Sequence, residues 1–183
     1  MKPHALILVD LQNDYFPGGQ MELEGAEAAV RQAARLLLRF RDRALPIFHV
    51  RHIAARPGAT FFLPDTPGSE IHPAVAPAAG EPVVVKHFPN SFRETDLLDR
   101  LRQAGARTLT ICGAMSHMCI DATTRAAADL GFACRVAHAA CATRALAFGA
   151  VTVPAAQVHA AYMAALSAAY AQVLSTADLL AAA

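Results

Sequence analysis

The sequence has no excess of charge of either sign, no long hydrophobic run and no closely spaced pair of cysteines. Its 16 lysines and arginines nearly balance its 15 aspartates and glutamates. This balance excludes the basic surface that a protein needs to bind nucleic acid or an anionic membrane. We therefore expect a small-molecule substrate as the partner, with no nucleic acid and no membrane.

The apolar runs of the chain are short. Residues 5–9 end at Asp10 and are too short for the core of a secretion signal. Polar residues such as Gln157 and His159 interrupt the alanine-rich C-terminal region, so it does not form a membrane span. The chain has 4 cysteines, which are Cys112, Cys119, Cys134 and Cys141. They form no Cys-x-x-Cys motif, and we predict free thiols in a reducing cytoplasm.

Apolar residues are abundant instead, at 55% of the 183 residues. This content is enough for one well-buried domain over residues 1–183. Much of the excess is alanine, which favours close helix packing and indicates that another subunit covers part of the surface. We predict a homodimer or a homotetramer.

Strand patterns alternate with helix patterns along the chain. Strands are expected at residues 5–9, 46–53, 82–85, 108–112, 133–137 and 173–175. Helices are expected directly after Cys119 and at residues 24–43, 95–103, 141–148 and 154–174. The alternation predicts an α/β fold with a mainly parallel sheet and right-handed crossovers.

The segment from Gly113 to Gly131 carries a candidate nucleophile. The residues after Cys119 are strong helix formers, which places this cysteine at or next to a helix N-terminus. The unpaired backbone N–H groups and the helix dipole there would favour a thiolate and lower the pKa of Cys119. The alternative is that Cys119 is a small, buried apolar residue.

Two further reactive side chains stand at strand ends, Asp10 after residues 5–9 and Lys86 after residues 82–85. Parallel strands end at one edge of the sheet, so an acid, a base and a nucleophile would meet in one pocket. This combination favours an enzyme. The alternative from another class is a binding or redox-sensing protein with Cys119 as its reactive thiol. A glycine-rich turn after the first strand is missing, which argues against a nucleotide-binding Rossmann fold.

Three segments, at residues 5–16, 86–92 and 113–131, together resemble the isochorismatase-like cysteine hydrolases, a family that includes nicotinamidases, N-carbamoylsarcosine amidases and isochorismatases. The resemblance implies a three-layer fold, with helices on both faces of a mainly parallel sheet of about six strands. It implies a catalytic triad of Asp10, Lys86 and Cys119. It also implies a cis peptide bond between Ala114 and Met115, with the backbone N–H groups of Met115 and Cys119 as the oxyanion hole.

The expected chemistry follows from these residue types. Cys119 attacks a carbonyl carbon, Asp10 moves the proton, and Lys86 holds both anions in place. The expected reaction is cleavage of the C–N bond in a small amide, carbamoyl compound or lactam through a thioester. The alternative within the family is hydrolysis of a vinyl ether such as isochorismate, which needs the aspartate and not the thiolate.

The nicotinamidases bind a divalent metal through an Asp-x-His pattern after the second strand. This chain has Val50, Arg51 and His52 at that place, so the aspartate is missing. His49 and His52 lie three residues apart on a strand and therefore point to opposite faces. We expect neither a metal nor another cofactor.

The substrate pocket should include the proline-rich segment of residues 54–82, which is typical of a lid, with its apolar residues 61–63. Met115 should also line the pocket. Its predicted substrate-binding residues are Phe16, His52, Asn90, Phe92 and His117. These aromatic and apolar groups favour a small, uncharged substrate.

Overall fold

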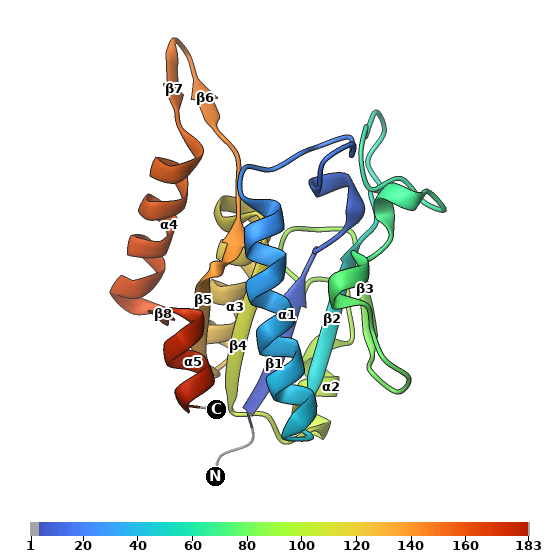
Figure 1. The fold of residues 1–183 in the computed structure, drawn as a ribbon, viewed down its shortest axis with the longest axis vertical. Helices are drawn as coiled ribbons and strands as arrows, with labels where there is room; N and C mark the ends of the chain where they lie inside the picture. Colours follow the sequence, from blue (N-terminus) through green and yellow to red (C-terminus); the bar gives the residue numbers. More distant parts are fainter. Residues whose placement is uncertain (1–3, 183) are drawn as a thin grey trace.

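The computed structural model describes residues 4–182 and contains a six-stranded, fully parallel sheet with the order β3-β2-β1-β4-β5-β8 (Figure 1). This arrangement confirms the predicted sheet. Its strands are β1 (His4–Val9), β2 (Ile47–His52), β3 (Val83–Lys86), β4 (Thr108–Ala114), β5 (Ala133–Ala142) and β8 (Ala171–Leu174).

Helices cover both faces of the sheet, so the fold has three layers. One face carries α1 (Ala26–Asp42) and α5 (Thr176–Ala182), and the other carries α2 (Leu97–Gln103), α3 (Asp121–Asp129) and α4 (Ala155–Ala169). Successive side chains of a strand point to opposite faces. In β1, Leu6 and Leu8 accordingly pack in the core with α1, whereas Ile7 packs in the core with α2 and α3.

Strand β1 is the centre of the sheet because all its residues from Ala5 to Val9 are apolar and almost fully buried. It pairs with β2 on one side and with β4 on the other. The chain order therefore reverses beside β1. In open parallel sheets, a crevice for ligands forms at the carboxyl ends of the strands at this position.

The helix that was predicted at residues 141–148 is wrong. Cys141 pairs with Gly113 across an irregularity in the β4–β5 ladder, so these residues continue β5. The following residues form a hairpin of β6 (Leu146–Phe148) and β7 (Val151–Val153), which projects from the body of the protein (Figure 1). Pairing with β4 is a long-range interaction that the local sequence does not reveal.

The lid segment, defined here as residues 54–82, is held by three consecutive polar residues that follow β1. The side chain of Gln12 donates to the Ser69 carbonyl at 2.8 Å, and that of Asn13 donates to the Pro67 carbonyl at 2.9 Å. Asp14 Oδ2 accepts a hydrogen bond from the Phe62 backbone at 2.6 Å. Short 3-10 turns lie at Asn13–Tyr15 (η1), Pro67–Ser69 (η2) and Pro73–Val75 (η3).

All four cysteines are free, as predicted, and the structure shows that all four are buried. Within residues 4–182, no helix is both long and apolar enough to cross a bilayer. The predicted domain of residues 1–183 includes residues 1–3 and 183, which lie outside the described part of the chain.

Candidate active site

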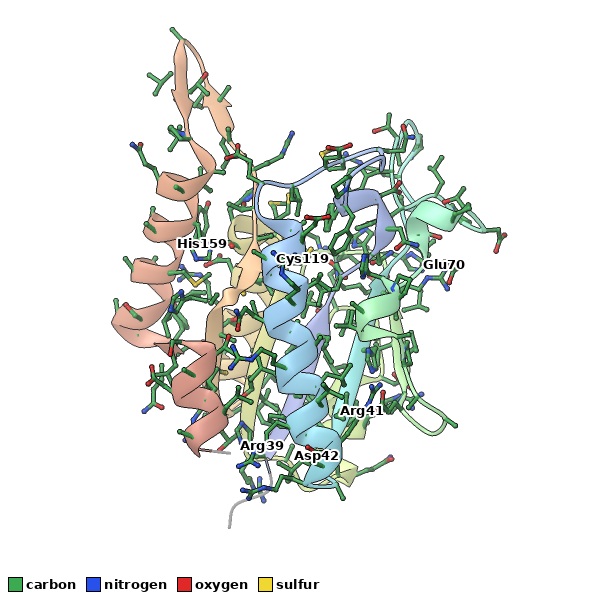
Figure 2. The ribbon with its side chains drawn as sticks, viewed as in Figure 1. Arg39, Arg41, Asp42, Glu70, Cys119 and His159 are labelled. Atoms are coloured by element: carbon green, nitrogen blue, oxygen red, sulfur yellow. The ribbon has the colours of Figure 1, made fainter. Side chains whose placement is uncertain are left out.

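Three strands deliver Asp10, Lys86 and Cys119 to one point at the carboxyl edge of the sheet. Asp10 directly follows β1, Lys86 is the last residue of β3, and Cys119 lies in the π-helical turn η4 (Ser116–Ile120) after β4. Lys86 Nζ lies 2.7 Å from Asp10 Oδ2 and 3.3 Å from Cys119 Sγ. Figure 2 places Cys119 in the upper half of the view, close to the loops at that edge.

Asp10 turns the chain sharply away from β1. Its φ of 52° lies in the left-handed region, which aspartate tolerates better than most residues. The side chain is fully buried. Oδ2 accepts the Lys86 hydrogen bond, but the buried Oδ1 has no hydrogen-bond partner within the described chain. Asp10 therefore keeps one acceptor free next to the thiol.

Lys86 is fully buried, and its ammonium group uses all three of its donors. They reach Asp10 Oδ2 at 2.7 Å, His52 Nδ1 at 2.9 Å and Cys119 Sγ at 3.3 Å. Burial acts to lower the pKa of Lys86. The negative charge of Asp10, together with the hydrogen bonds that Lys86 makes to Asp10 and Cys119, outweighs this effect and raises the pKa of Lys86 above its usual value. Lys86 is thus a permanent cation.

Cys119 is a thiol in this arrangement. Burial and the Asp10 carboxylate raise its pKa well above the usual range, and Lys86 offsets only part of this increase. The expected lowering of this pKa by a helix N-terminus is therefore wrong. The reason is that Cys119 sits inside the turn η4, shielded from water, with a carboxylate nearby. Attack by the sulfur requires a base, and Asp10 Oδ1 is free to act as one.

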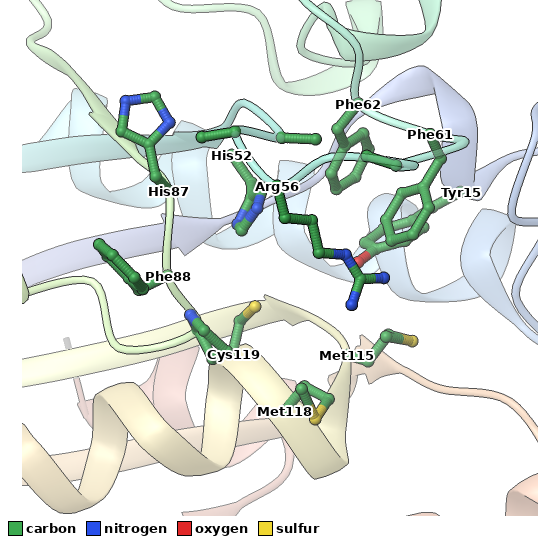
Figure 3. A pocket seen from close by; sticks show the side chains of 14 residues that line it. Tyr15, His52, Arg56, Phe61, Phe62, His87, Phe88, Met115, Met118 and Cys119 are labelled. Carbon is green, nitrogen blue, oxygen red and sulfur yellow. The ribbon is translucent and has the colours of Figure 1, made fainter.

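His52 is neutral, and its tautomer is fixed. Burial and the Lys86 charge lower its pKa to about 4. Because the Lys86 ammonium can only donate, His52 Nδ1 must accept, and the ring proton lies on Nε2. His52 lines the cavity beside Cys119 (Figure 3), so its Nε2–H is a potential donor to a bound ligand.

One group of three potential metal ligands occurs among the described residues, formed by Asp10, His52 and Cys119, with donor atoms within 4.8 Å of one another. These residues do not fit a divalent cation as they stand. The Lys86 ammonium lies among them and hydrogen-bonds to one donor atom of each, so its positive charge at the centre of the group repels a second cation.

A cavity of about 320 Å³ opens directly beside Cys119 (Figure 3), a volume suited to a small ligand. The lid covers one side of it, and the loop after β3 and the turn η4 form the other. Its lining residues are Tyr15, His52, Ala54, Ala55, Arg56, Ala59, Phe61, Phe62, His87, Phe88, Pro89, Met115, Met118 and Cys119.

Met115 lines the cavity and follows an unusual stretch of backbone. The peptide bond between Ala114 and Met115 is cis, as the family resemblance implied. The preceding Gly113 has a φ of 128°, and a Cβ at this position would overlap the backbone carbonyl of Val9. Only glycine lets β4 approach β1 this closely before the chain turns into η4.

Four of the five predicted substrate-binding residues do not line the cavity. Phe16 packs its ring on His72, with 4.0 Å between centroids. Phe92 stacks on Phe132, and Asn90 accepts a hydrogen bond from the Phe92 backbone. The fourth, His117, bonds through Nδ1 to Thr143 Oγ1 at 2.6 Å. Only His52 reaches the cavity, together with Met115, Phe61 and Phe62; Leu63 does not.

Sequence reasoning missed four of the larger lining side chains, which are Tyr15, Arg56, Phe88 and Met118. Tyr15 and Phe88 lie in the segments 5–16 and 86–92, which also contain the predicted residues Phe16 and Phe92. Burial, together with the charge of Asp10, raises the pKa of Tyr15, so this phenol is protonated. Nothing in the sequence around Arg56 or Met118 marks either as a lining residue.

Comparison with known proteins agrees with this geometry. A profile of the isochorismatase domain matches residues 4–178. YddQ, an uncharacterized isochorismatase family protein of Bacillus subtilis (strain 168), is 51% identical over 172 residues, which cover 94% of this chain and 96% of YddQ. The crystal structure of an isochorismatase-family protein from Oleispira antarctica has a TM-score of 0.95 at 56% identity, covering 98% of this chain and 97% of that one.

A third similar protein is streptothricin hydrolase of Streptomyces noursei, which is 37% identical over 139 residues. The match covers 76% of this chain but only 49% of streptothricin hydrolase, so this chain spans about half of that protein's length. The isochorismatase profile, in contrast, covers almost the whole chain. The protein therefore belongs to the isochorismatase family of hydrolases.

Proposed function

We propose that this protein is an amidase that cleaves the C–N bond of a small amide, carbamoyl compound or lactam through a thioester on Cys119. One observation carries the proposal. The Cys119 thiol lies at the wall of a small cavity, beside a buried carboxylate that has one free acceptor oxygen. This is the arrangement that a base-assisted sulfur nucleophile requires.

In the first half of the reaction, Cys119 Sγ attacks the carbonyl carbon while Asp10 takes the thiol proton. The triad of Asp10, Lys86 and Cys119 keeps its net charge in this transfer, since a thiolate replaces a carboxylate beside the same ammonium. The backbone N–H groups of Met115 and Cys119 would stabilise the oxyanion. The C–N bond then breaks, and Asp10 gives its proton to the leaving amine.

In the second half, water attacks the thioester carbon and Asp10 accepts a proton from it. The C–S bond breaks as the second adduct collapses, the thiolate recovers the proton from Asp10, and a carboxylic acid leaves. His52 acts as a positioning residue here, because its Nδ1 accepts the hydrogen bond that orients the Lys86 ammonium.

The burial of Cys119 argues against the redox-sensor alternative. Cysteines that sense oxidants are accessible and have a low pKa. Cys119 is only 5% exposed, and its surroundings raise its pKa. The similarity to streptothricin hydrolase further supports hydrolytic chemistry.

Product release from a substrate panel tests the proposal. The panel contains primary amides, carbamoyl compounds and lactams, with isochorismate as the vinyl ether, and ammonia or ring-opened product is measured. We expect turnover of at least one C–N substrate and its loss after alkylation of the active-site thiol. Turnover of isochorismate alone, insensitive to alkylation, would overturn the proposal in favour of the vinyl ether reaction.

A further inference from the structure

The side chains that line the cavity beside Cys119 include one permanent positive charge and no carboxylate. Arg56 is the one permanently charged side chain among the lining residues, which are otherwise aromatic, aliphatic, sulfur-containing or histidine. Lys86 adds a second cation behind Cys119, but Asp10 already pairs with it at 2.7 Å. A ligand entering the cavity therefore meets the Arg56 guanidinium as its free charge.

The Arg56 guanidinium has no hydrogen bond or ion pair with any described residue of the chain. Arg51 makes a useful contrast, because it belongs to the preceding strand and serves the structure. Its guanidinium donates to the Ser69 carbonyl at 2.9 Å and pairs with Glu70 at 2.8 Å. Figure 3 shows Arg56 extending from the lid into the space above Met115 and Met118.

Hydrogen bonds close the base of the loop that carries Arg56. The Ala54 amide donates to the Phe62 carbonyl at 2.9 Å, and Asp14 holds the Phe62 amide at 2.6 Å. The loop between these two residues is thus fixed at its base while Arg56 projects from it. A long, unpaired side chain on a fixed base can meet a ligand without rebuilding the lid.

A second arginine in another segment, Arg144, carries a charge that acts on a residue lining the cavity. Arg144 lies between β5 and β6, is exposed, and also has no hydrogen bond or ion pair among residues 4–182. Its positive charge acts on Tyr15 and His117, whereas that of Arg56 acts on His52. Tyr15 and His52 both line the cavity, so the positive potential of both arginines reaches its lining.

We infer that Arg56 binds a carboxylate of the substrate, which makes the substrate an amide that also carries one carboxylic acid. This inference rests on the proposed amidase function and replaces the expectation of an uncharged substrate. A guanidinium binds a carboxylate through two parallel, charge-assisted hydrogen bonds. The aromatic walls of Phe61, Phe62 and Phe88 fit a short apolar spacer between this carboxylate and the amide at Cys119.

Paired substrates test the inference. Malonamate, succinamate and glutaramate are compared with the corresponding diamides, after correction for the two equivalent amides of each diamide. In the wild type we expect kcat/KM to be at least about 10-fold higher for one of the acids than for its diamide. Arg56→Gln should remove this preference: KM for the acid should rise, and kcat/KM should fall at least about 10-fold more for the acid than for the diamide.

The matched control is Arg102→Gln, which removes the same charge from the last turn of α2, near the opposite edge of the sheet. Arg102→Gln should leave kcat/KM unchanged for both the acid and the diamide. Equal kcat/KM for acid and diamide in the wild type, across all three lengths, would overturn the inference. The inference is also overturned if Arg56→Gln lowers kcat/KM by the same factor for the acid and for the diamide.

A binding measurement separates this inference from the proposed function. Calorimetry on Cys119→Ala, with succinamate and succinamide as probes, should show a preference for the acid that disappears in Cys119→Ala/Arg56→Gln. If the wild type hydrolyses no amide but this preference is present, the amidase proposal fails and the carboxylate site stands. If amides are hydrolysed and no charge preference appears in either assay, the carboxylate site fails and the amidase stands.

Discussion

Two histidines on β2, His49 and His52, belong to two polar clusters that differ in whether the carboxylate of the cluster has all its hydrogen-bond partners. His49 Nε2 lies 2.8 Å from Glu81 Oε2, and Arg41 pairs with the same carboxylate at 2.7 Å. His52 belongs to the cluster of Lys86, Asp10 and Cys119. Figure 2 shows Arg41 and Cys119 at different heights along the sheet, so each cluster has its own surroundings.

The Glu81 cluster is saturated. Glu81 accepts hydrogen bonds from Arg41, from the Ala78 backbone and from His49. The Arg41 hydrogen bonds are the largest of the effects that lower the pKa of Glu81 to about 2. Asp10, in contrast, keeps a buried oxygen without a partner. A saturated carboxylate stabilises the fold, whereas an unsaturated one beside a thiol and a cavity is available for proton transfer.

The largest expected effect is that of Cys119→Ala, with Cys134→Ala as the matched control. Both cysteines are free and 5% exposed, but only Cys119 contacts Lys86. Cys119→Ala should lower kcat for a C–N substrate by about 10⁴-fold or more because it removes the nucleophile. Steady-state kinetics on both variants check this, and circular dichroism should show intact folds. Similar kcat values for the two variants would show that Cys119 is not the nucleophile. The cluster around Cys119 would then have no catalytic role to distinguish it from the Glu81 cluster.

Lys86→Met should reduce activity less severely but should also destabilise the protein. It leaves the Asp10 charge buried without its partner, which costs about 3 kcal/mol of unfolding free energy. The double variant Asp10→Asn/Lys86→Met should recover most of this stability and none of the activity. Urea unfolding and kinetics on the wild type, on Lys86→Met and on the double variant test the prediction. An undiminished stability of Lys86→Met would show that the ion pair contributes nothing to the fold.

Glu81→Gln should change stability without changing activity. The pKa of Glu81 is about 2 in the folded protein against an ordinary value of 4.5, so its stabilisation is present above pH 4.5 and is lost as the pH falls toward 2. We expect a loss of about 1–2 kcal/mol at pH 7, allowing for partial solvent screening. Across this acidic window, the stability of the variant should depend less on pH than that of the wild type. A fall in kcat would contradict the assignment of this cluster to the fold.

The sequence contained enough information to predict the sheet and the convergence of the triad. The apolar run of β1 stops at Asp10 and that of β3 stops at Lys86, and parallel strands place their ends on one edge. The prediction of a helix at residues 141–148 was wrong because the start of that segment pairs with β4, which is distant in the sequence. Local propensity carries no signal of such pairing.

The cavity walls could not be predicted because neighbouring residues in a turn point in different directions. In η1, Tyr15 lines the cavity while Phe16 packs on His72. Beyond β3, Phe88 lines it while Phe92 stacks on Phe132. Turn geometry decides between such neighbours, and it depends on distant partners such as the lid. The pKa of Cys119 was mispredicted for the same reason, because burial by other segments outweighs the local helix.

Mass spectrometry of the protein, quenched with acid during turnover of a slow amide substrate, tests the central claim most directly. We predict an acyl group, bound as a thioester, on the peptide that contains Cys119 and on none of the peptides with Cys112, Cys134 or Cys141. Sustained hydrolysis by a Cys119→Ala variant, or an acyl group on another cysteine that forms at the rate of turnover, would contradict the account.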